Sequence, residues 1–268
     1  MTELDQLTRA KAWLDSFRPL PNEVTAELRH RFEVRLTYHS TAIEGNTLTQ
    51  SETQIVIEKG ITIGGKSVHD HLEVIGHKEA LDFVFLLAAG LEPLGERQIR
   101  EIHSLVMKGQ GHGHHGAYRT LDVMAAGTEF CYPSHLLVHQ MMEELIEWLG
   151  TSSHLHPIER ATEAHVRFVT IHPFADGNGR VGRLLLNLLL IQSGYPIAVL
   201  SVEKRSAYID SLVAAQNGKG SETVLQLVCE AVKLSLRETI ELCVTSATAK
   251  EMSSVEIVAC KAWINEES

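Results

Sequence analysis

Apolar residues recur with a helical spacing along nearly the whole chain. In the first segment, Leu4, Leu7, Leu14 and Phe17 lie three or seven residues apart, as on one face of an α-helix. Together with capping residues and helix-ending glycines or prolines, this spacing predicts helices over residues 4–17, 28–36, 49–60, 67–90, 96–108, 134–149, 158–171, 180–192, 203–216 and 222–243. The pattern therefore predicts an all-α fold.

One segment departs from this spacing. Leu121, Val123 and Ala125 alternate with other residues, and Gly127 can turn the chain back toward Tyr132, which is the pattern of a small β-hairpin. An isolated hairpin is only marginally stable in water. We therefore expect the hairpin to be a functional element on the surface of the helical fold.

Composition and charge exclude several classes of protein. Hydrophobic residues make up 44% of the chain and the formal net charge is −10, so a soluble globular protein is expected and general nucleic-acid binding is not. The most apolar run, 184–200, is interrupted by Asn187 and Pro196, which favours a buried helix over a membrane span. The four cysteines lack C-x-x-C spacing and the first residues are acidic, so we expect a cytoplasmic protein without membrane attachment.

The segment with the clearest chemistry is HPFADGNGRVGR, residues 172–183. An imidazole and a carboxylate precede two glycines and a helix start, where backbone N–H groups can form an anion-binding nest. Arg180 and Arg183 are three residues apart and so share one helical face. His172 can take a proton near neutral pH, and Asp176 can hold a divalent cation. The combination indicates phosphoryl or nucleotidyl transfer.

This segment resembles the signature of Fic-domain proteins, H-x-F-x-D/E-G-N-G-R-x-x-R, at every fixed position, and the resemblance extends from about residue 40 to about residue 243. It implies a Fic-fold helical bundle with a small β-hairpin flap. It also implies transfer of AMP from ATP to a Ser, Thr or Tyr hydroxyl of a target protein, with release of pyrophosphate. Glycine at position 179, where the Doc-like kinases of the superfamily carry lysine, favours AMP transfer over phosphate transfer.

The resemblance assigns roles within the motif. His172 would be the catalytic base, and Asp176 would hold Mg²⁺ beside the phosphates. Gly177, Asn178 and Gly179 would line the nest for the α- and β-phosphates. The remaining nucleotide-binding positions would be Arg180, Val181, Gly182 and Arg183, with the two arginines neutralising the β- and γ-phosphates.

A second motif lies upstream. STAIEGN, residues 40–46, resembles the inhibitory motif S/T-x-x-x-E-G/N of the Fic class whose inhibitory helix is N-terminal. Ser40 and Glu44 would carry the inhibition. A carboxylate paired with Arg183 would occupy charge that the γ-phosphate needs, so we expect Glu44 to misplace the phosphates of bound ATP.

Residues outside the motif complete the implied nucleotide site. The hairpin matches the family's flap, whose edge can pair with an extended target segment. It would bring four residues near the nucleotide: Val123, Met124, Ala125 and Ala126. Tyr208 falls where the family packs an aromatic near adenine. Ile209 and Gln216 occupy two further nucleotide-facing positions where close relatives often carry Tyr and Asn.

We divide the chain into an N-terminal helical region with the inhibitory motif (1–60), a connecting helix (61–94), a Fic catalytic domain (95–245) and a C-terminal tail with weak structural signals (246–268). Lys66 falls in a loop where relatives couple dimerisation to the inhibitory helix, so a homodimer is expected. Two alternatives stay open. In one, the enzyme removes AMP from a modified protein with Glu44 aligning water; in the other, the chain is a catalytically silent binding protein.

Overall fold

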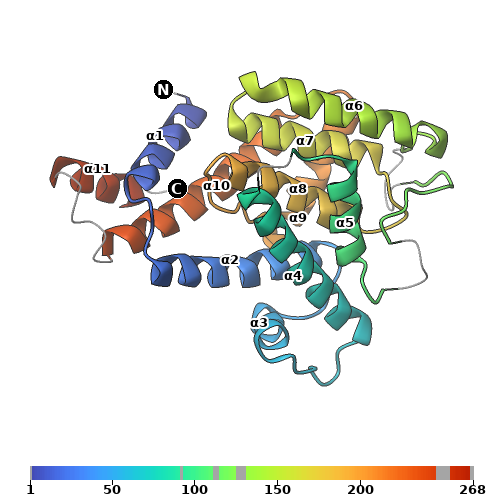
Figure 1. Ribbon diagram of the computed structural model, residues 1–268, viewed down its shortest axis with the longest axis horizontal. Coiled ribbons are helices and arrows are strands. Elements are labelled where there is room, and N and C mark those ends of the chain that lie inside the picture. The colour runs from blue at the N-terminus through green and yellow to red at the C-terminus, as the bar shows by residue number, and fades with distance from the viewer. Residues whose placement is uncertain (1, 91–92, 111–114, 125–130, 246–253, 266–268) are drawn as a thin grey trace.

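The helices predicted from the sequence are present, and most of their ends fall within a few residues of the prediction (Figure 1). The computed structural model describes residues 2–90, 93–110, 115–124, 131–245 and 254–265. Its α-helices are α1 (Glu3–Ser16), α2 (Asn22–Ile43), α3 (Gln50–Lys59), α4 (Val68–Ala89), α5 (Glu96–Val106), α6 (Val138–Thr151), α7 (Pro157–Ile171), α8 (Asn178–Gln192), α9 (Arg205–Gln216), α10 (Glu222–Thr245) and α11 (Ser254–Asn265). Short 3-10 helices η1 (His135–Leu137), η2 (Ser152–His154) and η3 (Val202–Lys204) precede α6, α7 and α9.

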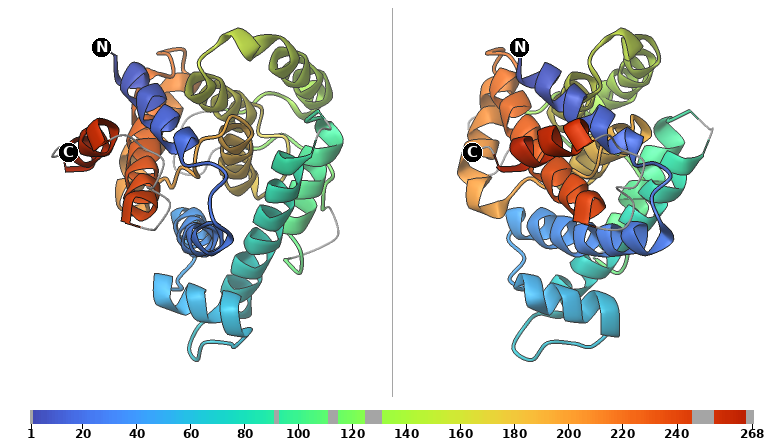
Figure 2. Two further views of the ribbon diagram at one scale, coloured as in Figure 1. Left: turned by 60° about the vertical axis from the view of Figure 1, so that its left-hand side comes forward. Right: turned by 90° about the vertical axis from the view of Figure 1, so that its left-hand side faces the viewer.

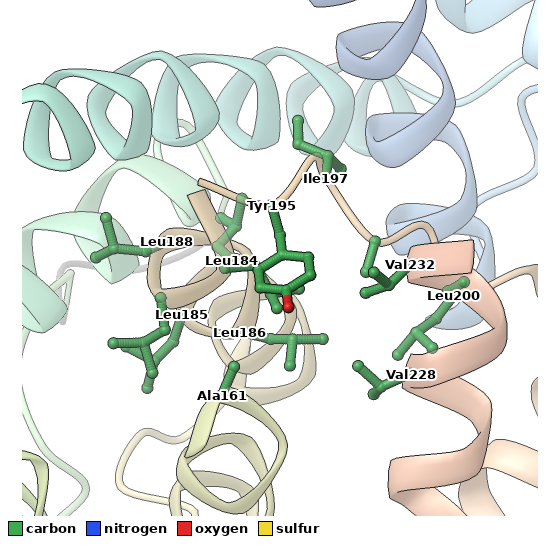
Figure 3. Close-up of a cluster of buried hydrophobic side chains, with 14 of the residues drawn as sticks. Ala161, Leu184, Leu185, Leu186, Leu188, Tyr195, Ile197, Leu200, Val228 and Val232 are labelled. Carbon is green, nitrogen blue, oxygen red and sulfur yellow. The ribbon is translucent and has the colours of Figure 1, made fainter. Parts of the chain in front are cut away.

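Helix α8 is the centre of the fold. It packs against α7, α4, α5 and α2, and every side chain from Leu184 to Leu190 is buried. Figure 3 shows its leucines between Ala161 of α7 and Val228 and Val232 of α10. A helix that is apolar all round is stable only when other elements enclose it. The run of residues 184–200 predicted as a buried helix is helical only as far as Gln192, and residues 193–200 follow it as a turn and an irregular segment.

The single buried amide in this leucine run has both of its polar atoms paired. Asn187 donates from Nδ2 to the carbonyl of Ala198 at 3.1 Å and accepts at Oδ1 from the Ala198 N–H at 2.7 Å. These two bonds fix the segment after α8, so that Tyr195, Ile197 and Leu200 close over the leucines (Figure 3). A buried polar group costs little when it is hydrogen-bonded in this way.

The N-terminal helices lie on two sides of this core. Helix α1 packs on α10 and α11 (Figure 2). The rings of Trp13 and Trp263 meet there, with centroids 6.0 Å apart. Helix α2 crosses α4 and reaches α8, which brings its C-terminal end to the motif of residues 172–183. Helix α11 lies in the C-terminal segment, 246–268, that we expected to be a tail with weak structural signals. The sequence of this segment does not reveal that it packs on α10 and α1.

The loop from α2 to α4 is held by local caps. Thr49 and Glu52 form the predicted reciprocal capping box at the start of α3, and Gly60 ends that helix with φ 61°. Ser67 accepts from the Asp70 N–H at 3.0 Å at the start of α4. Lys66 donates to the Thr47 carbonyl and lies 3.4 Å from Glu52, so it ties the loop to the segment after the inhibitory motif.

The predicted hairpin is not shown. In the described residues of this segment, Met124 and Cys131 form a single antiparallel bridge, and no strand is present. Residues 125–130, which include Ala125 and Ala126, lie outside the described residues. Alternation over so few residues cannot distinguish a two-stranded hairpin from a loop whose two legs touch once.

Gly76 allows α4 to approach α5 closely. A Cβ at this position would lie 2.7 Å from the Leu105 carbonyl oxygen and 2.8 Å from that of Val106. Both atoms belong to backbone within α5, so they cannot move aside cheaply. The contact fixes the position of α4, which carries residues that reach the motif.

We expect Gly76→Ala to lower the free energy of unfolding by about 1–3 kcal/mol through overpacking, measured by urea denaturation. Gly150→Ala is the matched control, because Gly150 is helical and a Cβ there meets nothing within 4 Å. It should be neutral or stabilise the protein by up to about 1 kcal/mol. Equal stability losses in the two variants would contradict the close-approach explanation.

Candidate functional site

The motif forms a tight loop between α7 and α8. His172 ends α7 with φ 51°, and among the described residues it alone adopts a positive φ without being glycine. Gly177, with φ 77°, precedes α8. The buried side chain of Asn178 donates to the Phe174 carbonyl at 2.8 Å and accepts from its N–H at 2.9 Å. Asn178 therefore shapes the loop with its side chain.

His103 of α5 supports this loop from beneath. Its ring stacks on Phe174 at 3.7 Å with an interplanar angle of 4°. Nδ1 accepts from the Gly116 N–H at 2.8 Å, so the proton lies on Nε2, which donates to the Asp176 carbonyl at 3.1 Å. Burial lowers the pKa of His103 to about 4, and the ring stays neutral while it bridges two loops.

His172 is largely enclosed by its neighbours, and its imidazole is neutral near pH 7. Its ring stacks on that of Tyr132 at 3.8 Å. Burial lowers its pKa to about 4, partly opposed by the Val169 carbonyl and by the charges of Glu44 and Asp176. A neutral imidazole is the form that accepts a proton, so His172 is in the basic form throughout the physiological pH range.

Arg119 joins the segment around the bridge to the motif loop. Its guanidinium donates to the carbonyls of His172 at 2.8 Å, Leu121 at 3.1 Å and Pro133. Its own N–H donates to the Pro173 carbonyl at 2.9 Å. Arg119 thus fixes the two segments that meet at Met124 and Cys131 against the backbone of His172 and Pro173. The sequence analysis did not assign this role to Arg119.

Glu44 lies directly over the start of α8. A Cβ at Gly179 would come within 2.1 Å of Glu44 Oε1. The same oxygen lies 2.7 Å from Arg183 Nη2, and Ser40 accepts from Arg183 through both its hydroxyl, at 3.0 Å, and its carbonyl, at 2.7 Å. The Glu44–Arg183 pair expected from the sequence is present, and its carboxylate covers the N-terminal end where an anion would bind.

Arg180 is held by a different carboxylate. Its Nη1 lies 2.9 Å from Glu73 Oε1 of α4 and donates to Gln110 Oε1 at 3.0 Å. Both side chains of the ion pair are buried, with 2% of Arg180 and 8% of Glu73 exposed. Glu73 was missed in the sequence analysis, although it lies on the buried face of α4 with Val74, His77 and Leu81. A carboxylate on such a face needs a buried partner.

Asp176 is the open carboxylate of the site. Its side chain is 68% exposed, and Oδ1 lies 3.6 Å from Arg180 Nη2 and accepts from the Gly177 N–H. An exposed carboxylate beside an anion-binding helix end suits a hard cation such as Mg²⁺. His69, Asp70 and Glu73 also bring ligand atoms within 4.8 Å of one another, but Asp70 and Glu73 are already bound to Thr47, Asn46 and Arg180.

Three other residues predicted to contact the nucleotide lie in the interior of the protein. Val181 is buried in the core. Gly182 faces α7, where a Cβ would meet Val169 at 2.9 Å. Tyr208 is buried with its hydroxyl 2.8 Å from His165 Nε2. These three positions are packed in the interior, and nucleotide contacts there remain predictions.

Four further predicted positions lie nearer the surface. Ile209 is half-buried. Gln216 donates to the Val169 carbonyl at 3.4 Å. Val123 is half-buried, and Met124 is exposed at the bridge. Nucleotide contacts at these positions remain predictions.

Comparison with known proteins identifies the family. The Fic/DOC family profile matches residues 93–190. Protein adenylyltransferase fic-1 of Caenorhabditis elegans is 38% identical over 212 residues, which are 74% of this chain and 41% of that protein. Protein adenylyltransferase Fic of Nematostella vectensis is 38% identical over 187 residues, 68% of this chain and 43% of that protein. The chain spans less than half the length of these two relatives.

Solved structures agree with the sequence relatives. Fic-1 from C. elegans superposes with a TM-score of 0.80 at 32% identity, covering 91% of this chain and 73% of that one. A Fic domain containing signaling protein from Bacteroides thetaiotaomicron gives a TM-score of 0.75 at 29% identity over 97% of this chain and 98% of that one. The chain belongs to the Fic/DOC family. In the described part of the chain, no helix has the length and apolar character of a membrane span.

The buried histidines predict acid sensitivity. Burial lowers the pKa of His77 to about 3 and that of His103, His165 and His172 to about 4. The unfolded chain binds these protons near pH 6.5, so stability is full above that pH and falls as the pH drops toward 4. We expect a loss of about 1.4 kcal/mol per pH unit for each such histidine, measured by urea denaturation between pH 7 and 5.

His172→Gln provides the internal control for this measurement, because it removes one of the four titrating groups. Its stability should fall less steeply with acidification, by about 1.4 kcal/mol per pH unit. A free energy of unfolding that stays constant from pH 7 to pH 5 in the unsubstituted protein would refute the assignment.

Proposed function

We propose that this chain is a protein adenylyltransferase that moves AMP from ATP to a Ser, Thr or Tyr hydroxyl of a target protein, and that Glu44 holds it inactive. The observation that carries the proposal is the Glu44 carboxylate over Gly179 and against Arg183. A nest and two arginines form an anion site, and a carboxylate of the same chain occupies part of it. The names of the relatives support the reaction class.

The chemistry follows from the neutral His172. Its imidazole takes the proton of the target hydroxyl, whose oxygen forms a bond to the α-phosphorus of ATP. The bond from that phosphorus to the bridging oxygen of the β-phosphate breaks, and pyrophosphate leaves. Backbone N–H groups at the start of α8 would stabilise the charge that develops on the phosphoryl oxygens. Positioning and charge neutralisation supply most of the catalysis in such reactions.

Asp176 would hold Mg²⁺ in this scheme. The fit rests on its exposed carboxylate at the mouth of the nest and on the preference of Mg²⁺ for one or two carboxylates together with substrate phosphates. When bound, the ion would neutralise phosphate charge. Arg180 and Arg183 would provide the protein's own positive charge around the β- and γ-phosphates.

The target would dock beside the Met124–Cys131 bridge, close to Tyr132 and His172. Exposed Met124 and Leu121 offer apolar contacts there. A homodimer remains a prediction for the loop of Lys66, where the neighbouring Val68 is exposed. A cytoplasmic location likewise remains a prediction.

Removal of AMP from a modified protein is the second candidate. It is favoured by the position of Glu44, whose carboxylate lies beside Gly179 at the start of α8, and whose charge partly opposes the lowering of the His172 pKa by burial. A carboxylate beside an imidazole can align a water molecule for attack on a phosphodiester. In that case Glu44 would have a catalytic role as well as an inhibitory one.

Glu44→Gly should increase transfer from α-labelled ATP by roughly 30–150-fold, if release of Arg183 removes about 2–3 kcal/mol from the barrier. The readout is labelling of the enzyme itself and of lysate proteins at saturating Mg·ATP. Glu27→Ala is the control, because it removes an exposed ion pair with Arg31 on the same helix and should not increase labelling. Equal labelling by the Glu44 variant and the unsubstituted chain would contradict autoinhibition.

The same variant separates the two candidate reactions. If Glu44 also aligns water, Glu44→Gly will stop releasing AMP from a labelled target while it transfers AMP faster. Arg183→Ala combined with Glu44→Gly should stay slow, because the charge that Glu44 releases is then missing.

His172→Ala in the Glu44→Gly background should lower transfer by about 10²–10⁴-fold, the usual contribution of general acid–base catalysis. Binding of ATP, followed by calorimetry, should survive because the nest and arginines are intact. His139→Ala serves as the control, since His139 contacts the Tyr118 ring at 5.0 Å and lies outside the motif. Undiminished labelling by the His172 variant would remove it as the base.

A further inference from the structure

The ion pair between Glu73 and Arg180 places a permanent negative charge beside a proposed phosphate-binding arginine. Unlike Glu44, of which 36% is exposed, Glu73 is 8% exposed and lies within α4, in its second turn. Its position is fixed by packing against the core. Glu73 therefore cannot leave the site in the way that an inhibitory carboxylate must.

Both oxygens of Glu73 are engaged by groups whose orientation is fixed. Oε1 binds Arg180, and Oε2 accepts from Asn46 Nδ2 at 2.8 Å. Asn46 also donates from Nδ2 to the Asp70 carbonyl at 2.9 Å and accepts from the Leu48 N–H at 3.0 Å. The amide can therefore present only its NH₂ group to Glu73. An ionised carboxylate, an acceptor at both oxygens, satisfies both partners.

Gln110 accepts from the same guanidinium nitrogen that Glu73 contacts. Its Nε2 donates to the Val106 carbonyl at 2.7 Å, which leaves Oε1 for Arg180 Nη1. Nη2 faces Met107 Sδ at 3.6 Å and Asp176 Oδ1 at 3.6 Å. Arg180 therefore has two short contacts at Nη1 and a longer ion pair to Asp176 at Nη2.

We propose that Glu73 is a positioning residue, which binds Arg180 at Nη1 and so keeps the Arg180–Asp176 ion pair long, so that the Asp176 carboxylate stays open to the cation of Mg·ATP. Asp176 and Arg180 are four residues apart, a spacing at which opposite charges pair readily. Without Glu73, the carboxylate that remains in an ion pair with Arg180 is that of Asp176. A buried charge without a close partner is destabilising, so we expect the Arg180–Asp176 pair to shorten. The proposal rests on the proposed function, because it assumes that Asp176 serves the nucleotide-bound metal.

Glu73→Gln tests this at nearly constant volume. The amide can accept from Arg180 through its oxygen, but its NH₂ group then faces the NH₂ group of Asn46, so one of the two contacts is lost. The assay uses His172→Ala/Glu44→Gly as the parent, which should bind nucleotide without turnover. Calorimetry then measures two affinities: that of Mg·ATP, and that of AMP without metal.

Glu73→Gln should weaken Mg·ATP binding by about 10- to 100-fold, the range that a small misplacement in a site can cause, and should leave AMP binding unchanged. Glu79→Gln is the matched control, because Glu79 lies on the same helix and pairs with exposed Lys108 at 2.7 Å. It should change neither affinity. A merely structural defect would weaken AMP and Mg·ATP binding together.

Unchanged or tighter Mg·ATP binding by the Glu73 variant would overturn the proposal, as would an equal loss for AMP. A parent that binds no nucleotide would overturn the proposed function itself, and this inference with it. If Glu73→Gln fails to fold, Asn46→Ser provides the same test. This variant keeps the Glu73–Arg180 ion pair but removes the hydrogen bond that Asn46 donates to Glu73 Oε2. We expect a smaller loss of affinity, confined to Mg·ATP. An unchanged affinity for Mg·ATP would refute the proposal.

Discussion

Two buried arginines on the central helix impose the main constraint on this molecule. Arg180 and Arg183 are each 2% exposed on a helix that is otherwise almost wholly apolar. A guanidinium remains charged in a protein, and a buried charge without a partner is strongly destabilising. The surrounding elements must therefore supply acceptors: α4 provides Glu73, the end of α2 provides Glu44 and Ser40, and the start of the loop after α5 provides Gln110.

The two carboxylates meet this demand in different ways. Glu73 is buried within α4, whereas Glu44 follows the last turn of α2 and is partly exposed. A terminal residue can move at low cost because few contacts hold it. One arginine is thus held by a fixed partner and the other by a removable one. In the proposed function, this asymmetry would allow the same pair of charges to serve both stability and the binding of an anionic substrate.

The sequence predicted what depends on local pattern. Helix positions, the capping box at Thr49 and the pairing of Glu44 with Arg183 followed from spacing or from the family motif. The supporting contacts could not be predicted, because Glu73, His103 and Arg119 reach the motif from elements 53 to 107 residues away in the chain. The predicted hairpin is not shown beyond one antiparallel bridge between Met124 and Cys131 in the described residues, since alternation does not reveal whether two segments form a ladder.

The surroundings of Gly179 restrict which residues can occupy this position. The space beside its Cα is filled by the Glu44 carboxylate in this structure and would be the path of a phosphate in the proposed reaction. A side chain there would meet the Glu44 carboxylate and, in the proposed reaction, the phosphate as well. Under the proposed autoinhibition, a substitution of Gly179 would therefore impair inhibition and nucleotide binding together, whereas a substitution of Glu44 would remove the inhibitory carboxylate alone.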